Sequence, residues 1–212
     1  MKKKTTHKVV QPVASGPVPT TIEFLLDETG SMSTYLSQVI GGFQDFINEQ
    51  RGIPGSCLFT LTKFDTRGQR NPYTDLDVGM VPYLTTSTYT PSGGTNLYDT
   101  IVSRIEARYA QLQSWDIKPR VLFVCMTDGE DNASRYQVPY VKQRIIEATE
   151  AGWTFVFLGA YDRASQVARN LGFMDGNIQC FEGARMQETM RELSAATKAY
   201  RVAETAQTTL YR

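Results

Sequence analysis

The distribution of apolar residues divides the chain from residue 21 onward into two alternating kinds of segment. Short apolar runs predict strands over residues 21–26, 58–64, 73–78, 120–127, 153–159 and 178–181. Apolar residues three or four positions apart predict amphipathic helices over residues 36–47, 97–112, 138–148, 164–171 and 184–204. Strands that alternate with helices in this way form βαβ units. The pattern therefore predicts an α/β fold with a doubly wound, mostly parallel central sheet flanked by helices.

Two details of the pattern place individual strands in this sheet. Residues 120–127 and 153–159 are almost wholly apolar, which is typical of central parallel strands buried on both faces. Residues 73–78 carry Asp75 and Asp77 at alternate positions, as an edge strand does. Residues 67–70 can turn the chain back into this strand, so we expect one antiparallel edge strand.

The chain of 212 residues has room for one substantial domain. Residues 1–20 hold four lysines, no acidic residue and a linker rich in Pro, Gly and Ser, which predicts a basic tail. We therefore expect a tail over residues 1–20, a domain over residues 21–205 and a C-terminal tail over residues 206–212.

Charge and composition exclude several classes of function. The 22 basic and 22 acidic residues balance, which argues against a general nucleic-acid-binding protein. No apolar run approaches the roughly 18–20 residues of a membrane span, and no apolar stretch of a signal peptide follows the first lysines. Three widely spaced cysteines favour reduced thiols. These features predict a cytoplasmic protein, or one incorporated in a virion if a phage encodes it, that acts on neither membranes nor nucleic acid.

Histidine restricts the chemistry further, because His7 is the only one in the sequence and lies in the predicted tail. The predicted domain therefore lacks the residue that Ser-His-Asp catalysis and histidine-bound zinc require. Its chemistry must come from carboxylates, hydroxyls, lysines or a metal bound through oxygen.

Oxygen-containing side chains gather in three loops beside the predicted strands. The first strand runs into D-E-T-G-S-M-S at residues 27–33, P-S-G-G-T-N at residues 91–96 precedes a helix, and the fourth strand ends in T-D-G-E-D at residues 127–131. Doubly wound sheets bind ligands beyond the carboxyl ends of their strands. The sequence therefore predicts a binding site where these loops meet.

The side chains of these loops favour a hard divalent cation. Asp27, Thr29 and Ser31 alternate along the first loop, so one tight turn can direct all three inward. Thr95 follows a Gly-Gly pair that allows close backbone approach, and Asp128 precedes a glycine. Each motif alone is also typical of a helix cap or a turn. Together, their two carboxylates and three hydroxyls suit Mg²⁺, Mn²⁺ or Ca²⁺ and disfavour zinc and copper.

The motifs D-x-T-G-S, G-G-T-N and T-D-G, in this order, resemble the metal-ion-dependent adhesion site of the von Willebrand factor type A domain. The resemblance covers residues 21–200 and fits a standalone domain of prokaryotic or phage type. It departs mildly at Thr29, where the family more often has serine, and the threonine hydroxyl can still bind a metal.

The resemblance implies a role for each residue. Ser31 and Thr95 would bind the metal directly when a partner is bound, whereas Thr29, Asp27 and Asp128 would bind it directly or through water. One coordination position would stay open for an Asp or Glu of a protein partner. The resemblance also implies that the last predicted helix shifts when the site changes state.

Four other acidic residues fall at or near predicted strand ends and are candidates to line the site without binding the metal directly: Glu130, Asp131, Asp65 and Asp162. The first two also suit an ordinary solvated loop.

Three functions remain open from the sequence. The leading hypothesis is a non-enzymatic binding module that captures an acidic residue through its metal and acts as an adaptor or assembly factor, with an ATPase as one possible partner. The second is a structural subunit of a large assembly, such as a phage particle. The third is a Mg²⁺-dependent phosphatase with Asp27 as nucleophile, which is disfavoured because Thr29 stands where a second aspartate would serve as general acid.

Overall fold

The computed structural model describes residues 18–182, 185–203 and 209–211, with only the backbone of Tyr161 and Asp162. Most of the two predicted tails lies outside these residues. The strands are β1 (Thr20–Asp27), β2 (Cys57–Asp65), β3 (Gly68–Asp77), β4 (Arg120–Thr127), β5 (Thr154–Ala160) and β6 (Ile178–Phe181). The helices are α1 (Leu36–Arg51), α2 (Leu97–Gln113), α3 (Val138–Glu150), α4 (Tyr161–Asn170) and α5 (Met186–Val202). Short 3₁₀ helices cover Gly30–Tyr35, Val78–Met80 and Asp175–Asn177.

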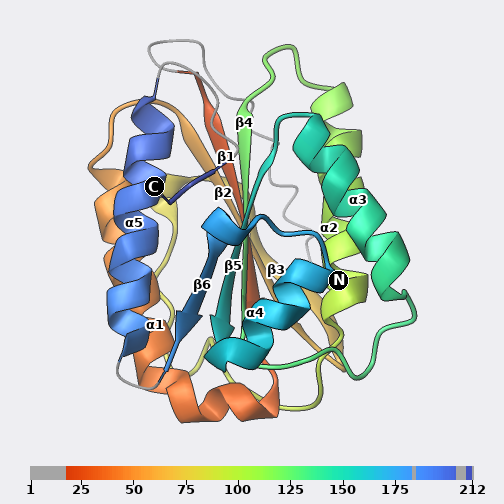
Figure 1. Cartoon of the computed structure of the whole chain (residues 1–212). Coiled ribbons are helices and arrows are strands. Elements are labelled where there is room, and N and C mark those ends of the chain that lie inside the picture. The colour runs from red at the N-terminus through yellow and green to blue at the C-terminus, as the bar shows by residue number, and fades with distance from the viewer. Residues whose placement is uncertain (1–17, 183–184, 204–208, 212) are drawn as a thin grey trace, which may run out of the picture.

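The strands form one six-stranded sheet in the order β3-β2-β1-β4-β5-β6. Only β3 pairs antiparallel to its neighbour, so the predicted fold class is confirmed. Figure 1 shows α1 and α5 on one face of the sheet and α2 and α3 on the other. The strand order reverses direction between β1 and β4, which is where open α/β sheets bind ligands.

Aromatic side chains fill the core on both faces of the sheet. Phe24 in β1 packs against Phe43 and Phe46 of α1 and Phe59 of β2, with ring centroids 5.8–6.0 Å apart. On the opposite face, Tyr109 of α2 stacks on Trp153 at 4.6 Å. Because both faces of β1, β2, β4 and β5 are covered, these strands are buried along their whole length.

The β2–β3 hairpin differs from the sequence-based expectation. β3 begins at Gly68, which pairs with Asp65, so the turn consists of residues 66–67 and overlaps the predicted segment 67–70 only at Arg67. Gly68 has a φ of 117°, a conformation that glycine adopts readily. β3 lies at the edge of the sheet, as Asp75 and Asp77 indicate, but Asp75 itself is 3% exposed and bonds to Arg108 of α2. The ion pair explains how a charged residue can lie buried at this position.

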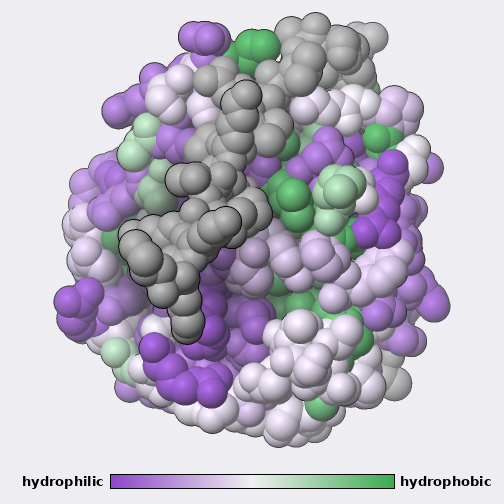
Figure 2. All heavy atoms as spheres, turned by 180° about the vertical axis from the view of Figure 1, so that it is seen from behind, coloured by the Kyte–Doolittle hydropathy of each residue, from purple (hydrophilic) through white to green (hydrophobic). Residues whose placement is uncertain are grey.

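The surface is mixed in character. Viewed from behind, hydrophilic residues predominate and hydrophobic ones form small separate patches (Figure 2). Within the described residues, no helix is both long and apolar enough to span a membrane. All three cysteines are free thiols, and two of them, Cys57 and Cys125, are buried.

Candidate metal centre

Three loops meet at the carboxyl edge of the sheet, as the sequence predicts. The loop after β1 is joined to the glycine-rich loop by a hydrogen bond from Gly30 N to Gly93 O at 3.0 Å. The loop after β4 joins the same glycine-rich loop, because Asn132 N donates to Thr95 O at 2.9 Å. Through the glycine-rich loop, these contacts join the loop after β1 to the loop after β4, which lies about a hundred positions further along the chain.

Asp27 is a completely buried carboxylate of this edge. Its Oδ1 accepts a hydrogen bond from Thr29 N at 2.7 Å, and its Oδ2 accepts one from the Thr127 hydroxyl at 2.5 Å. Tyr89 donates its hydroxyl to the Asp27 carbonyl at 2.6 Å and fixes the backbone of the same residue. The side chain is therefore held by the turn that follows β1 and by the end of β4.

Hydroxyls link the first loop to Asp128. Ser31 Oγ donates to Asp128 Oδ1 at 2.8 Å and lies 3.2 Å from Thr29 Oγ1. Thr95 is 3% exposed, and its backbone N donates to Asn132 Oδ1 at 2.9 Å. Its hydroxyl lies close to the loop after β4, since Thr95 Oγ1 is 3.7 Å from the position that a Cβ would take at Gly129.

Within the described part of the chain, the two carboxylates carry negative charge that no basic side chain offsets. Among the described residues, neither Asp27 nor Asp128 forms an ion pair with a lysine or arginine. Burial raises the pKa of Asp27 from 3.8 to about 6, against hydrogen bonds from Thr127 and Thr29 that lower it. Burial likewise raises the pKa of Asp128. A bound cation would stabilise the ionised form of both groups.

The donor set fits a hard cation only when hydroxyls take part. No group of three or more His, Cys, Asp or Glu side chains in the described part of the chain is placed to hold a metal. A cation at this edge would therefore need hydroxyl and water oxygens in addition to Asp27 and Asp128. Thr29, Ser31 and Thr95 supply those hydroxyls, so the residues present fit Mg²⁺ or Mn²⁺.

A cavity of about 440 Å³ opens beside these residues. Its lining includes the candidate ligands Ser31, Thr95 and Asp128, together with residues 129–132 and the beginning of α4. Glu130 lies at this cavity and bonds to Arg163 of α4 at 2.6 Å. Sequence reasoning did not single out Arg163, because nothing in its local pattern distinguishes it from other surface arginines.

The remaining acidic candidates have different surroundings. Asp131 lines the cavity, but its oxygens accept hydrogen bonds from Ser134 and from Tyr98 N, so it organises its own loop. Asp65 is not among the residues that line the cavity, and it is bonded to Arg67 and Arg70. The side chain of Asp162 lies outside the described residues.

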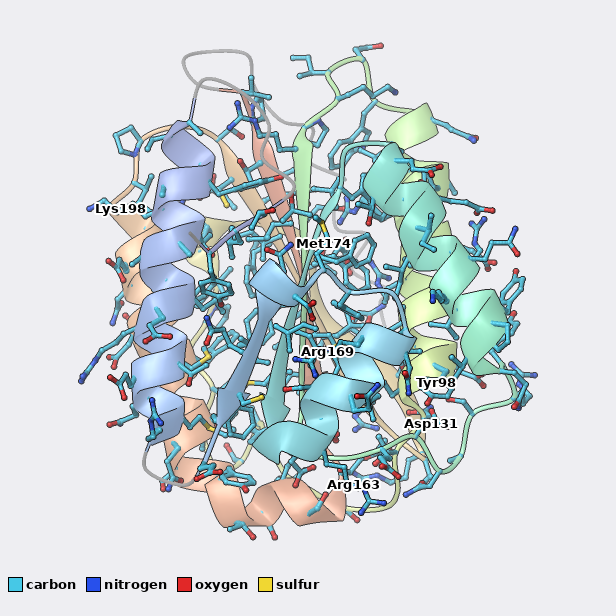
Figure 3. All side chains as sticks on the ribbon, viewed as in Figure 1. Tyr98, Asp131, Arg163, Arg169, Met174 and Lys198 are labelled. Atoms are coloured by element: carbon cyan, nitrogen blue, oxygen red, sulfur yellow. The ribbon has the colours of Figure 1, made fainter. Side chains whose placement is uncertain are left out.

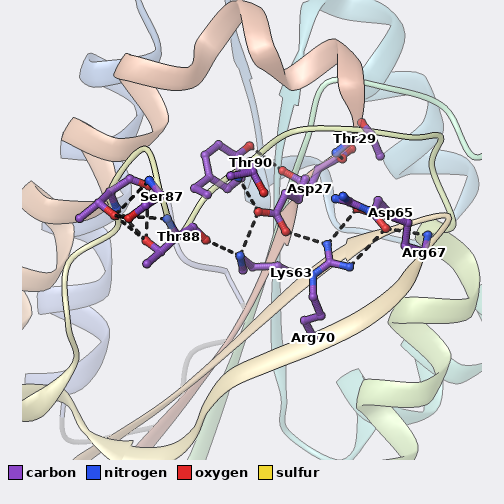
Figure 4. Close-up of polar contacts among 12 residues, drawn as sticks. Asp27, Thr29, Lys63, Asp65, Arg67, Arg70, Ser87, Thr88 and Thr90 are labelled. Carbon is purple, nitrogen blue, oxygen red and sulfur yellow. Dashed lines mark hydrogen bonds and ion pairs between the residues drawn. The ribbon is translucent and has the colours of Figure 1, made fainter.

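A buried ionic cluster lies directly behind the first loop. Glu28 accepts from Lys63 Nζ at 2.9 Å, from Arg70 Nη2 at 2.7 Å and from Thr90 N at 2.7 Å. Arg70 also bonds to Asp65 at 2.9 Å, and Figure 4 shows Lys63, Arg70 and Asp65 in one network of contacts. The cluster ties the end of β1 to the β2–β3 hairpin and to the loop before α2. The sequence does not predict this cluster, because its members come from four separate segments.

The chain is similar to known proteins in its fold and not in its sequence. No family model matches the chain, and no curated protein matches it. The structure is similar to proximal thread matrix protein 1 from the mussel byssus with a zinc-occupied MIDAS motif, with a TM-score of 0.61 at 13% identity. That match covers 88% of this chain and 47% of the mussel protein.

Two other solved structures have a similar fold. The von Willebrand factor type A protein from Catenulispora acidiphila has a TM-score of 0.58 at 14% identity, over 86% of this chain and 43% of that one. The manganese-loaded TRAP protein of Plasmodium vivax has a TM-score of 0.55 at 13% identity, over 82% of this chain and 71% of that one. The chain spans about half the length of the mussel and Catenulispora proteins.

At identities this low the likeness extends to the fold alone. The expectation of a von Willebrand factor type A fold is confirmed, and two of these relatives hold a divalent metal, zinc or manganese. The metal ligands of the present chain stay a prediction from its own residues. The chain has the α/β fold of von Willebrand factor type A domains.

Proposed function

We propose that this chain is a protein-binding module that holds Mg²⁺ or Mn²⁺ at the carboxyl edge of its sheet and uses it to capture an acidic residue of a partner. The observation that carries the proposal is the pair of carboxylates, Asp27 and Asp128, that lie beside three hydroxyls with no basic partner in the described residues. Metal-loaded relatives with the same fold support it. We place the module in an adaptor or assembly role, for which an ATPase is one candidate partner.

In this proposal the hydroxyls and the carboxylates of the site have different roles. Ser31, Thr95 and Thr29 would hold the cation through their hydroxyls, and Asp27 and Asp128 would hold it directly or through water. When hydroxyls contribute much of the coordination, the cation keeps net positive charge and attracts an external carboxylate. The cavity beside Ser31, Thr95 and Asp128 leaves space for that carboxylate.

The side chains at this edge favour binding over phosphoryl chemistry. A nucleophilic Asp27 would need a general acid beside it to protonate the leaving group. Position 29 carries a threonine, whose hydroxyl is a poor general acid at neutral pH. We therefore propose a non-enzymatic role.

Partner capture in the presence and absence of metal tests the proposal. The full-length chain would be immobilised and exposed to lysate of its source in Mg²⁺ or in EDTA, and the proteins that differ would be identified by mass spectrometry. One such protein would then be purified, and its affinity measured with wild type and with Asp128→Ala. We expect binding in Mg²⁺ that EDTA and Asp128→Ala both abolish.

A matched control separates the site from general surface charge. Asp175→Ala removes an exposed carboxylate that pairs with Arg169, away from the cavity. This variant should bind the partner as wild type does. Partner binding that persists undiminished in EDTA and in Asp128→Ala would place the interface elsewhere and contradict the proposed function.

A further inference from the structure

The cavity beside the candidate metal centre carries a positive side chain at its rim. Arg163 belongs to the first turn of α4 and lines the same cavity as Ser31, Thr95 and Asp128. Figure 3 shows Arg163 at the carboxyl edge of the sheet, whereas Arg169 lies farther along the same helix. Among the described residues that line this cavity, Arg163 is the one with a positive charge.

Local packing fixes α4 close to this edge. β5 ends at Ala160, and α4 begins at the next residue, so the helix starts directly beside the loop after β4. Gly159 allows the close approach, because a Cβ at that position would collide with the side chain of Ala164. Ala160 and Ala164 line the cavity with short side chains and leave room for a ligand between the candidate metal ligands and Arg163.

The only described ion-pair partner of Arg163 is easily replaced. Its Nε lies 2.6 Å from Glu130 Oε1, and the two side chains are 81% and 51% exposed. Ion pairs as exposed as this contribute little to stability, since water solvates the separated charges nearly as well. A carboxylate that approaches from solvent can therefore displace or share Glu130 at small cost.

From this arrangement we infer that the site recognises a partner segment with two acidic residues, one directed to the metal and the other to Arg163. The inference rests on the proposed function, because the first carboxylate requires the cation. The second contact would set specificity: arginine presents a planar fork of N–H donors that matches a carboxylate, and a rim charge also guides the encounter of the two molecules. Glu130 would compete for the same guanidinium and so reduce the gain in affinity from the second acidic residue.

Synthetic peptides can test this inference without knowledge of the natural partner. The probes are ten-residue Gly/Ser peptides with one Asp, or with two Asp separated by zero to three residues. Their affinities for the full-length chain would be measured by NMR titration in Mn²⁺-free Mg²⁺ buffer and in EDTA. We expect the best two-Asp peptide to bind about fivefold more tightly than the one-Asp peptide in Mg²⁺, which is the scale of one exposed charge contact.

Variants of matched chemistry assign the second contact. Arg163→Gln should bring the ratio of the two affinities close to one, and Glu130→Gln should increase it. Arg169→Gln removes an exposed arginine from the last turn of the same helix and should keep the wild-type ratio. The inference is overturned if Arg163→Gln keeps that ratio, or if no two-Asp peptide binds more tightly than the one-Asp peptide. If EDTA leaves the one-Asp affinity unchanged, the proposed function itself fails, whichever ratio is observed.

Discussion

Three carboxylates at the carboxyl edge of the sheet differ in what surrounds them. Asp65 is buried between two arginines, whereas Asp27 and Asp128 have hydroxyl and amide donors only in the described structure. Burial would raise the pKa of Asp65, but hydrogen bonds from Arg67 and Arg70 outweigh it and lower the pKa to about 2. The pKa of Asp27 moves the opposite way, to about 6. Asp65 is thus a stabilising group of the hairpin, and the other two are suited to a cation.

The lowered pKa of Asp65 predicts a pH-dependent contribution to stability. Its folded pKa of about 2 lies below the ordinary 3.8, so the contribution is present above about pH 3.8 and is lost as the pH falls through about 2. We expect Asp65→Asn to lower the free energy of unfolding at pH 7 by about 1–2 kcal/mol. The shift alone would give more, but Arg67 and Arg70 are 50% and 36% exposed.

Urea unfolding of wild type and Asp65→Asn between pH 7 and pH 2 measures this contribution. The difference between the two proteins should shrink toward the acid end of the range. Asp116→Asn, at an exposed residue, is the control and should match wild type throughout. A difference that stays constant down to pH 2 would contradict the assignment of the pKa shift to Asp65.

Thr95 offers a second test at the scale of single residues. Under the proposed function its hydroxyl binds the cation, so Thr95→Ala should weaken Mn²⁺ affinity by roughly tenfold, on the scale of one polar contact to a charged group. Thr95→Ser keeps a hydroxyl and should restore most of the affinity. Electron paramagnetic resonance of Mn²⁺ titrated into each variant gives the dissociation constants. Equal affinity in Thr95→Ala and wild type would remove Thr95 from the ligand set.

At the scale of elements, a buried ion network joins β1, β3 and α2. Glu23 of β1 accepts from Arg104 and Arg108 of α2, and Arg108 also bonds to Asp75 of β3 at 2.7 Å. Both carboxylates and Arg108 are almost completely buried. Asp75 adopts a φ of 49° at an irregular stretch of the β2–β3 pairing, and its side chain points into the network. The helix is therefore attached to the sheet by charge as well as by apolar packing.

Removal of the central arginine should destabilise the fold strongly. Arg108→Met leaves Glu23 and Asp75 without their shared partner, and an uncompensated buried charge costs about 3–5 kcal/mol. The free energy of unfolding from urea titration at pH 7 measures this cost. Arg135→Met is the control, since Arg135 is 88% exposed in its pair with Asp99 and should change stability by less than about 1 kcal/mol. A similar small change in both variants would show that the network contributes little.

Elements that leave a local pattern in the sequence are predicted well, whereas contacts between distant segments are not. The apolar runs predict β1, β2, β4 and β5 within one or two residues, because burial on both faces leaves a strong signal in the sequence. The first half of β3 has no apolar alternation and is held by its pairing with β2, so the pattern misses its beginning at Gly68. Asp27 and Asp128 are recognisable as candidates in the sequence because each directly ends or follows a predicted strand. Arg163 and Glu28 are not, since their partners lie on elements distant in sequence.

At the scale of the whole molecule, the candidate metal centre exists only in the folded chain. Its residues come from the end of β1, the loop before α2 and the end of β4, and backbone hydrogen bonds between these loops hold them together. An unfolded chain would separate Asp27 from Asp128 by about a hundred residues and could not gather them around one ion. A metal that binds this site would therefore bind the native state and stabilise the entire domain.

This linkage predicts a metal-dependent melting temperature. A ligand that binds only the native state stabilises it by about 1.4 kcal/mol at ten times its dissociation constant. For a domain of this size, that stabilisation corresponds to an increase in Tm of roughly 3–6 °C. Calorimetric or fluorescence melting in EDTA and across a titration of Mg²⁺ and of Mn²⁺ measures the shift. Asp128→Ala should melt at the same temperature with and without metal, because the variant lacks a ligand and relieves part of the buried negative charge. Superimposable wild-type curves in EDTA and at every metal concentration would mean that the carboxyl edge binds no cation, and the proposed function would lose its basis.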